Sequence, residues 1–109
     1  MAAQLPGPGT RLDLNVEKSP AGAVVRCVGV ITASTMGPFM DRLHPLVAES
    51  KQVVLDLGQI TYIDSSGLGG IVRLWSSGQK SNCALQVSNV PPRIKELLSL
   101  TSLASIFQC

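Results

Sequence analysis

Two neighbouring serines, flanked by an aspartate and a glycine, are the residues of this chain best placed to do chemistry: Asp64-Ser65-Ser66-Gly67. Before them, the apolar and β-branched run at 53–57 predicts a buried strand. After them, apolar residues recur with the spacing of one helix face, at Leu68, Ile71, Val72 and Trp75. The serines are therefore predicted at a strand-to-helix junction, where the positive end of the helix dipole tolerates an added phosphate.

The simplest interpretation of this junction is a capped helix in an α/β domain. Asp64 or one of the serines can accept hydrogen bonds from the unpaired N–H groups of the first turn. Glycines at 67, 69 and 70 would let a backbone or a partner come close. Capping alone would account for these residue types, so a function at this junction needs further support.

Nucleotide and acyl-transfer motifs do not fit the same residues. The third glycine of a dinucleotide fingerprint would fall at Val72, and the chain lacks the Gly-Lys-Ser/Thr of a P-loop. A nucleophile elbow needs glycine two residues before its serine, where this chain has Asp64 or Ile63. A small hydrolase using Ser66 would have to recruit the only histidine, His44, from another helix. The carboxylates form no spaced acid/base pair, so the sequence predicts a protein that is not an enzyme.

Length and charge exclude several other classes. The 109 residues fit one domain, and nine basic against seven acidic residues give a net charge of +2, spread along the chain. This charge pattern, with aromatic residues at only 4%, argues against nucleic-acid binding. Residues 1–10 lack the basic start and long apolar centre of a secretion signal, and no apolar run reaches membrane-spanning length. A cytoplasmic location is therefore expected.

No metal or cofactor site is predicted. The cysteines Cys27, Cys83 and Cys109 are widely spaced and form no Cys-x-x-Cys pair. Cys27 and Cys83 fall in apolar, strand-like runs and are predicted to be buried, whereas Cys109 is predicted to be an exposed thiol. His44 has no second histidine and no nearby cysteine to complete a metal site, so it is predicted on the surface of a helix.

The rest of the chain predicts a hairpin followed by alternating strands and helices. After a flexible tail at 1–10, the predicted order is β-β-α-β-α-β-α with an optional closing strand. Strands are predicted at 11–17, 23–31, 53–57 and 83–87, and the optional one at 106–107. Helices are predicted after the cap candidates Thr32 to Thr35, at 65–78 with its end at Gly78, and from Pro91-Pro92 onward. The nearly all-apolar strand at 23–31 predicts burial on both faces and a central place in the sheet. Pro45 predicts a kink or break of the first helix near Leu43 and His44.

This order predicts a single α/β domain at 11–109, with a mixed four- to five-stranded sheet and helices packed on it. The predicted core positions are Val25, Val28, Leu43, Val54, Leu55, Ile71, Val72, Leu85 and Leu97.

The stretch at 53–69 closely resembles the signature of the STAS domain family of bacterial anti-sigma factor antagonists: Val53-Val54-Leu55-Asp56-Leu57-x-x-Ile60-x-Tyr62-Ile63-Asp64-Ser65-Ser66-Gly67-Leu68-Gly69. The resemblance extends to Gly29-x-Ile31 with Thr35, Phe39, Leu43 and Leu46, and to Val90-Pro91-x-x-Ile94-x-x-Leu97-Leu98 with Leu103-x-x-Ile106-Phe107. It covers about 12–107 and implies a STAS-like fold.

What the resemblance implies is a phosphorylation switch. Such domains bind an anti-sigma factor that is itself a serine kinase and free a sigma factor for transcription; the kinase phosphorylates the antagonist, and a PP2C-type phosphatase resets it. The acceptor in members with Asp-Ser-Ser-Gly carries over to Ser66, with Ser65 as the fallback. The implied partner-binding residues are Thr32, Asp64, Ser65, Ser66, Gly67, Leu68 and Gly69, of which Leu68 is expected in the core.

One departure from the family pattern supports a different role. Where relatives usually carry an acidic residue at the end of the second strand, this chain reads Gly29-Val30-Ile31-Thr32. Thr32 can cap a helix but supplies no charge contact to a kinase. The alternative is a STAS subunit that is not switched, acting as a scaffold in a signalling assembly or beside a lipid-transport ATPase.

Overall fold

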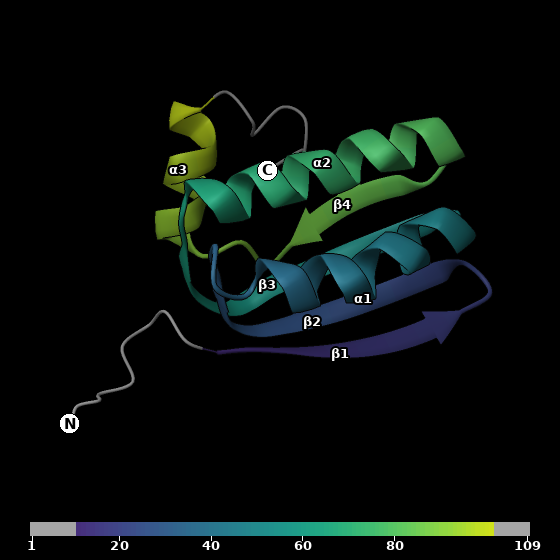
Figure 1. Ribbon diagram of the computed structural model, residues 1–109, viewed down its shortest axis with the longest axis horizontal. Helices are drawn as coiled ribbons and strands as arrows, with labels where there is room; N and C mark the ends of the chain where they lie inside the picture. The colour runs from purple at the N-terminus through teal and green to yellow at the C-terminus, as the bar shows by residue number, and fades with distance from the viewer. Residues whose placement is uncertain (1–10, 102–109) are drawn as a thin grey trace.

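The computed structural model describes residues 11–101 in the predicted order of elements (Figure 1). The elements are β1 (Leu12–Ser19), β2 (Gly22–Ile31), α1 (Met36–Glu49), β3 (Gln52–Ile63), α2 (Ser65–Ser81), β4 (Ala84–Ser88) and α3 (Pro92–Leu100). The predicted tail at 1–10, the optional strand at 106–107 and Cys109 lie outside the described residues.

The strands form one mixed sheet in the order β1-β2-β3-β4. β1 pairs with β2 in antiparallel fashion, through a hairpin that closes at the pair Ser19 and Gly22, whereas β2 with β3 and β3 with β4 are parallel. The predicted α/β class and mixed sheet are confirmed. Because β2 and β3 are parallel neighbours, the chain leaves both strands at the same edge of the sheet.

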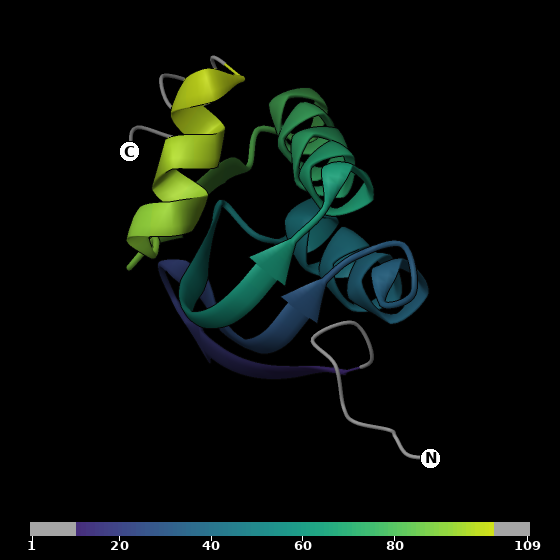
Figure 2. The same cartoon turned by 90° about the vertical axis from the view of Figure 1, so that its left-hand side faces the viewer.

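Helices α1 and α2 lie together on one face of this sheet, and α3 lies apart from them (Figure 2). Strand β2 therefore alternates: Val25 and Cys27 are fully buried, while Val24 is 39% exposed. The prediction that β2 is buried on both faces is wrong, although its central place in the sheet is confirmed. Valine is tolerated on the open face because β-branched residues suit a pleated, half-exposed surface.

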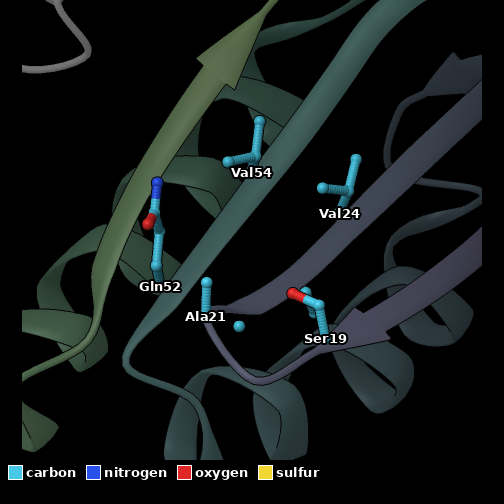
Figure 3. A pocket seen from close by; sticks show the side chains of 7 residues that line it. Ser19, Ala21, Val24, Gln52 and Val54 are labelled. Carbon is cyan, nitrogen blue, oxygen red and sulfur yellow. The ribbon is translucent and has the colours of Figure 1, made fainter.

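The same alternation decides which of the predicted core positions are buried. Five of the predicted positions are buried, namely Val25, Leu43, Leu55, Ile71 and Leu85, and Val72 and Leu97 pack partly buried against them. Val28 and Val54 are only half-buried, because they fall in the register that faces away from α1 and α2. Val24 and Val54 line a shallow depression of about 210 Å³ on the open face (Figure 3). The depression lies at the hairpin end of β2, about 30 Å along the strand from Ile31.

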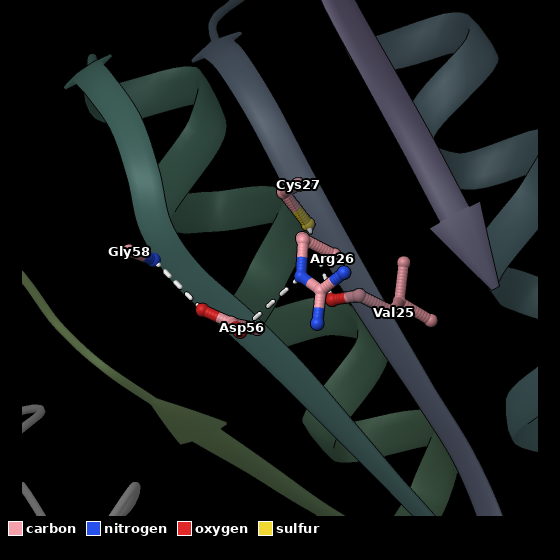
Figure 4. Close-up of polar contacts among 5 residues, drawn as sticks. All are labelled: Val25, Arg26, Cys27, Asp56 and Gly58. Carbon is pink, nitrogen blue, oxygen red and sulfur yellow. Dashed lines mark hydrogen bonds and ion pairs between the residues drawn. The ribbon is translucent and has the colours of Figure 1, made fainter. Parts of the chain in front are cut away.

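Strand β3 runs six residues beyond the predicted end at Leu57, because it stays paired with β2 as far as Ile63. The pairing shifts register between Arg26 and Val28, where β3 contains an extra residue around Gly58. The Asp56 carboxylate accepts a hydrogen bond from the Gly58 N–H at 3.0 Å and lies 3.8 Å from Arg26 Nε (Figure 4). Gly58 breaks the apolar pattern of the sequence but marks a bulge rather than the end of the strand.

Two predicted helix features are corrected. Helix α1 continues through Pro45 without a break, since Pro45 and Asp41 are both exposed and the carbonyl that loses its helical partner can face water. Helix α2 ends at Ser81 and not at Gly78, and its C-cap residue, Asn82, takes the left-handed conformation (φ 59°). Gly78 is a buried helical residue: a Cβ there would lie 2.5 Å from the Cys83 carbonyl oxygen. The predicted start of α3 at Pro92 is confirmed.

Within residues 11–101, no helix combines the length and the apolar character needed to cross a membrane.

Candidate functional site

The predicted serine junction lies where β2 and β3 end side by side. Their last paired residues are Ile31 and Ile63, and the Asp64 N–H extends the ladder by donating to the Ile31 carbonyl at 3.3 Å. The β2–α1 loop and the first turn of α2 therefore start from neighbouring points at one edge of the sheet.

Asp64 is the N-cap of α2, as predicted. Its backbone is extended, and its Oδ1 accepts a hydrogen bond from the Gly67 N–H at 2.8 Å. The first main-chain helical bond runs from the Leu68 N–H to the Asp64 carbonyl at 3.0 Å. The other carboxylate oxygen, Oδ2, accepts from the Ala33 N–H at 3.3 Å. One side chain thus fixes the start of α2 and also holds the neighbouring loop.

Ser65 and Ser66 form the first turn of α2, and both are exposed. Within residues 11–101, neither hydroxyl has a hydrogen-bond partner. Both oxygens therefore face solvent at the positive end of the α2 dipole, where an incoming group can reach them. A Ser66 hydroxyl sealed inside the core would have ruled out its modification, but Ser66 is exposed.

Of the two alternatives predicted for these glycines, a close backbone or a close partner, Gly67 and Gly70 serve contacts within the protein. A Cβ on Gly67 would lie 2.1 Å from the Ile31 carbonyl oxygen, and one on Gly70 would lie 2.5 Å from the Met36 sulfur. These two glycines let α2 pack against the end of β2 and against α1, so the close approach that they permit is internal. Gly69 differs from both, because a Cβ there would meet nothing closer than Arg73 Nη1, at 3.8 Å.

Leu68 is 8% exposed and belongs to the core, as predicted. Its burial anchors the first turn of α2, in which Ser65 and Ser66 are exposed. Gly67 is also buried, which leaves Ser65, Ser66 and Gly69 as the predicted partner-binding residues of α2 with accessible surface.

The two threonines of the β2–α1 loop are buried. Thr32 and Thr35 are only 6% and 5% exposed. Thr35 precedes α1 but makes no side-chain cap; its Oγ1 accepts from the Thr32 N–H at 3.0 Å and donates to the Val30 carbonyl at 3.0 Å. Thr32 does not cap α1 either, and its Oγ1 bonds to Ser34 Oγ at 2.9 Å. Thr32 thus supports the loop from within rather than offering its side chain to a partner.

Sequence reasoning missed Ala33 as a member of this site. Its contribution is a main-chain N–H, directed at Asp64 from a loop 31 residues earlier in the chain. Alanine carries no functional side chain, and no spacing rule connects positions 33 and 64. Only the parallel pairing of β2 and β3 brings these two residues together.

The structure holds Ser66 and His44, the two residues that a hydrolase would need together, far apart. His44 Nε2 lies 3.3 Å from Ser77 Oγ, on the exposed side of α1 as predicted. Residues 66 and 77 of α2 are about 16 Å apart along the helix axis. A base held beside Ser77 is therefore out of hydrogen-bond reach of Ser66.

Cys27 and Cys83, the two cysteines in the part of the chain that the structure describes, supply no reactive group to the site. Cys27 and Cys83 are buried, as predicted. Burial, with a further contribution from the charge of Asp56, raises the pKa of the Cys27 thiol to about 12, so that it stays protonated and unreactive at neutral pH. Among residues 11–101, no group of His, Cys, Asp and Glu side chains is arranged to hold a metal ion.

The fold is an α/β domain with a mixed sheet and a capped, serine-bearing junction where β2 and β3 end. Residues 14–108 match the protein family described as Mlab, STAS domain. The chain therefore belongs to the STAS domain family.

Curated relatives agree with this family and narrow it. The chain is 26% identical over 70 residues to a STAS-domain containing protein of Pseudomonas aeruginosa, a match that covers 64% of this chain and 69% of the relative. It is 24% identical over 95 residues to the anti-sigma-B factor antagonist of Bacillus subtilis, a match that covers 87% of each protein. The chain is an anti-sigma factor antagonist-like STAS domain.

Solved structures share the fold. An anti-sigma factor antagonist from Mycobacterium paratuberculosis superposes with a TM-score of 0.75 at 21% identity, over 89% of this chain and 83% of that one. The unphosphorylated form of the anti-sigma factor antagonist SpoIIAA gives a TM-score of 0.74 at 12% identity, over 85% of this chain and 84% of that one. At these identities the likeness shows the fold alone.

Proposed function

We propose that this protein is an anti-sigma factor antagonist that binds an anti-sigma factor with serine kinase activity and is switched off when that kinase phosphorylates Ser66. The observation that carries the proposal is the exposed Ser66 hydroxyl in a first turn fixed by the Asp64 cap. A kinase needs such a hydroxyl, because an acceptor buried in the core cannot be reached.

The position of Ser66 suits a switch that changes binding and leaves the fold intact. A phosphate adds a charge of about −1.5 to −2 at neutral pH. The N-terminus of α2 accommodates negative charge, so the modified domain stays folded. The same charge, added beside the Asp64 carboxylate, changes the surface that a partner meets. Phosphorylation then ends the complex by repulsion and steric conflict, and a PP2C-type phosphatase restores the binding form.

Ser65 is the alternative acceptor, since it is also exposed in the first turn. The resemblance of Asp64-Ser65-Ser66-Gly67 to the family motif favours the second serine. Gly69 has no neighbour closer than 3.8 Å to its Cβ position, which leaves room for a partner to approach the helix beside Ser66.

The test is to incubate the protein with its cognate anti-sigma kinase and ATP, and to locate the phosphate by peptide mass spectrometry. We expect phosphate on Ser66, no phosphorylation of Ser66→Ala, and unchanged phosphorylation of Ser65→Ala, which is the matched control. Ser66→Asp should lose binding to the kinase. If the wild-type protein binds the kinase but neither serine is phosphorylated, the proposed phosphorylation switch is wrong.

A second candidate is a STAS subunit that is not switched, acting in a signalling assembly or beside a lipid-transport ATPase. The observation that favours it is at residue 32, where a threonine that is 6% exposed stands in place of the acidic residue usual in switched relatives. Affinity purification from the native host separates the two: the scaffold predicts recovery of transporter or assembly subunits and no kinase.

A further inference from the structure

The β2–α1 loop and the first turn of α2 form one continuous exposed surface. Ala33 and Ser34 of the loop are exposed, as are Ser65 and Ser66 of the helix. They are neighbours because β2 and β3 are parallel and end together at Ile31 and Ile63. The absence of a side chain at Gly67 lets the end of β2 lie against the helix, since a Cβ there would overlap the Ile31 carbonyl.

The two halves of this surface are tied by a single side chain. Asp64 divides its carboxylate, with Oδ1 on the Gly67 N–H of α2 and Oδ2 on the Ala33 N–H of the loop. A carboxylate can accept at both oxygens at once, whereas a serine, threonine or asparagine cap offers a single acceptor atom. Aspartate is therefore the cap residue that serves both segments.

The loop is also braced from inside. The buried Thr35 hydroxyl joins the Thr32 N–H to the Val30 carbonyl, at 3.0 Å on each side. Bracing from within by Thr35 and from the side by Asp64 leaves the exposed Ala33 and Ser34 little freedom to move relative to Ser66. A partner that docks on a preorganised surface loses less conformational entropy than one that must order a loop.

We infer that Asp64 is a positioning residue that joins the β2–α1 loop to the phosphorylatable turn, so that Ala33 and Ser34 belong to the surface that binds the anti-sigma kinase. This inference rests on the proposed function and extends it, because it assigns Asp64 a role beyond capping and names Ala33 and Ser34, in place of the buried Thr32, as the exposed residues of the loop that meet the partner. The partner contacts the loop and the Ser66 turn together, and the affinity depends on their relative position.

The role of Asp64 is tested on the free protein by amide hydrogen exchange. Asp64→Asn keeps a carbonyl oxygen for the Gly67 N–H but turns a donor, the amide NH2, toward the Ala33 N–H. We expect exchange of the Ala33 amide to become about tenfold faster while that of Gly67 is unchanged. Asp64→Ala should accelerate both amides. Equal acceleration of both amides in Asp64→Asn, or of neither, would overturn the bridging role.

The loop's part in binding is tested with two matched substitutions at exposed alanines. Ala33→Glu adds charge to the inferred surface, and Ala48→Glu adds the same charge near the other end of α1. We expect kinase binding to weaken about tenfold or more for Ala33→Glu and to stay at the wild-type value for Ala48→Glu, with both proteins equally stable to heat. Asp64→Asn should weaken binding in the same direction as Ala33→Glu.

The outcomes distinguish this inference from the proposed function. If the wild-type protein binds the kinase and Ala33→Glu binds equally well, the inference is wrong and the proposed function stands. If the wild-type protein does not bind the kinase, the proposed function falls, and the docking role of the loop falls with it. The exchange measurement needs no partner, so it decides the bridge between Asp64 and Ala33 in either case.

Discussion

The two strand-to-helix junctions at the same edge of the sheet are both rich in hydroxyl side chains, but they place those hydroxyls differently. The first, Thr32-Ala33-Ser34-Thr35, leads into α1, and the second, Asp64-Ser65-Ser66-Gly67, leads into α2. Thr35 turns its hydroxyl into the protein, where it bonds to the main chain of its own loop. Ser65 and Ser66 leave theirs in solvent, because Asp64 has already supplied the cap.

The difference shows that a hydroxyl near a helix N-terminus is either bonded to the main chain or left accessible to solvent, according to its burial. At the α1 junction the buried hydroxyl satisfies an N–H and a carbonyl that have no access to water. At the α2 junction the carboxylate provides that satisfaction, which leaves the serines available for modification. The following predictions test this division, in order of decreasing effect.

The largest effect is expected at Gly67, on which the closeness of the two junctions depends. Gly67→Ala places a Cβ 2.1 Å from the Ile31 carbonyl, so the main chain must shift, and the free energy of unfolding should fall by about 3 kcal/mol. Gly69→Ala meets nothing closer than 3.8 Å and should raise it by about 0.5 to 1 kcal/mol through helix propensity. Urea unfolding of the two variants measures both changes. Equal effects would show that the junctions do not depend on this contact.

The next effect compares a hydroxyl from each junction. Thr35→Val keeps the shape of the side chain but leaves the Thr32 N–H and the Val30 carbonyl without their partner, so stability should fall by about 2 kcal/mol. Ser66→Ala removes an exposed hydroxyl and should change stability by about 0.5 kcal/mol or less. Phosphorylation should show the reverse dependence, being lost in Ser66→Ala and kept in Thr35→Val. A similar loss of stability in Thr35→Val and Ser66→Ala would contradict the distinction between the buried hydroxyl and the exposed one.

The third prediction asks whether burial also decides the behaviour of a thiol on β2. The buried Cys27 keeps its proton to about pH 12, whereas the same thiol in the unfolded chain ionises near its ordinary pKa of 9.0. Between these values the unfolded state binds fewer protons than the folded state, so stability falls as the pH rises. From pH 8 to pH 10, the wild-type protein should lose about 1.4 kcal/mol more than Cys27→Ala. Parallel stability curves for the two proteins would show that this thiol ionises equally in both states.

The smallest effect is expected at the ion pair that joins the two strands on the open face. Arg26 Nε is 3.8 Å from Asp56 Oδ2, and the Arg26 side chain is half exposed. Solvent screens such a pair, so Arg26→Gln should lower stability by about 0.5 kcal/mol or less. Kinase binding should be unchanged, because the pair lies on the strands upstream of both junctions. A loss of binding would show that the junctions are sensitive to strand register.

Local patterns were sufficient to predict much of this molecule. The run at 53–57, the periodic residues from Leu68 to Trp75 and the prolines before Ile94 predicted elements of the right type in the right order. The Asp64 cap and the burial of Leu68 also followed from local sequence, because capping and helix periodicity involve residues three or four positions apart.

Errors arose where distant segments decide the outcome. The apolar composition of β2 predicted two buried faces, but whether a face is covered depends on where α1 and α2 pack. The strand predicted at 53–57 stopped at Leu57, but pairing with β2 carries β3 on to Ile63. Local sequence left open whether the glycines at 67 and 70 admit a backbone or a partner, and the answer depends on their neighbours Ile31 and Met36, which come from other elements.

The sequence by itself determined the type and order of the elements, and that Asp64 or a neighbouring serine caps the α2 helix. Tertiary structure alone decided that Ser65 and Ser66 are exposed while the threonines of the neighbouring loop are buried, and that Ala33 shares the carboxylate of Asp64. The physical reason is range: capping and periodicity act over one helical turn, whereas exposure and the Asp64–Ala33 contact arise only when β2 and β3 align in parallel and bring residues 31 positions apart to the same edge.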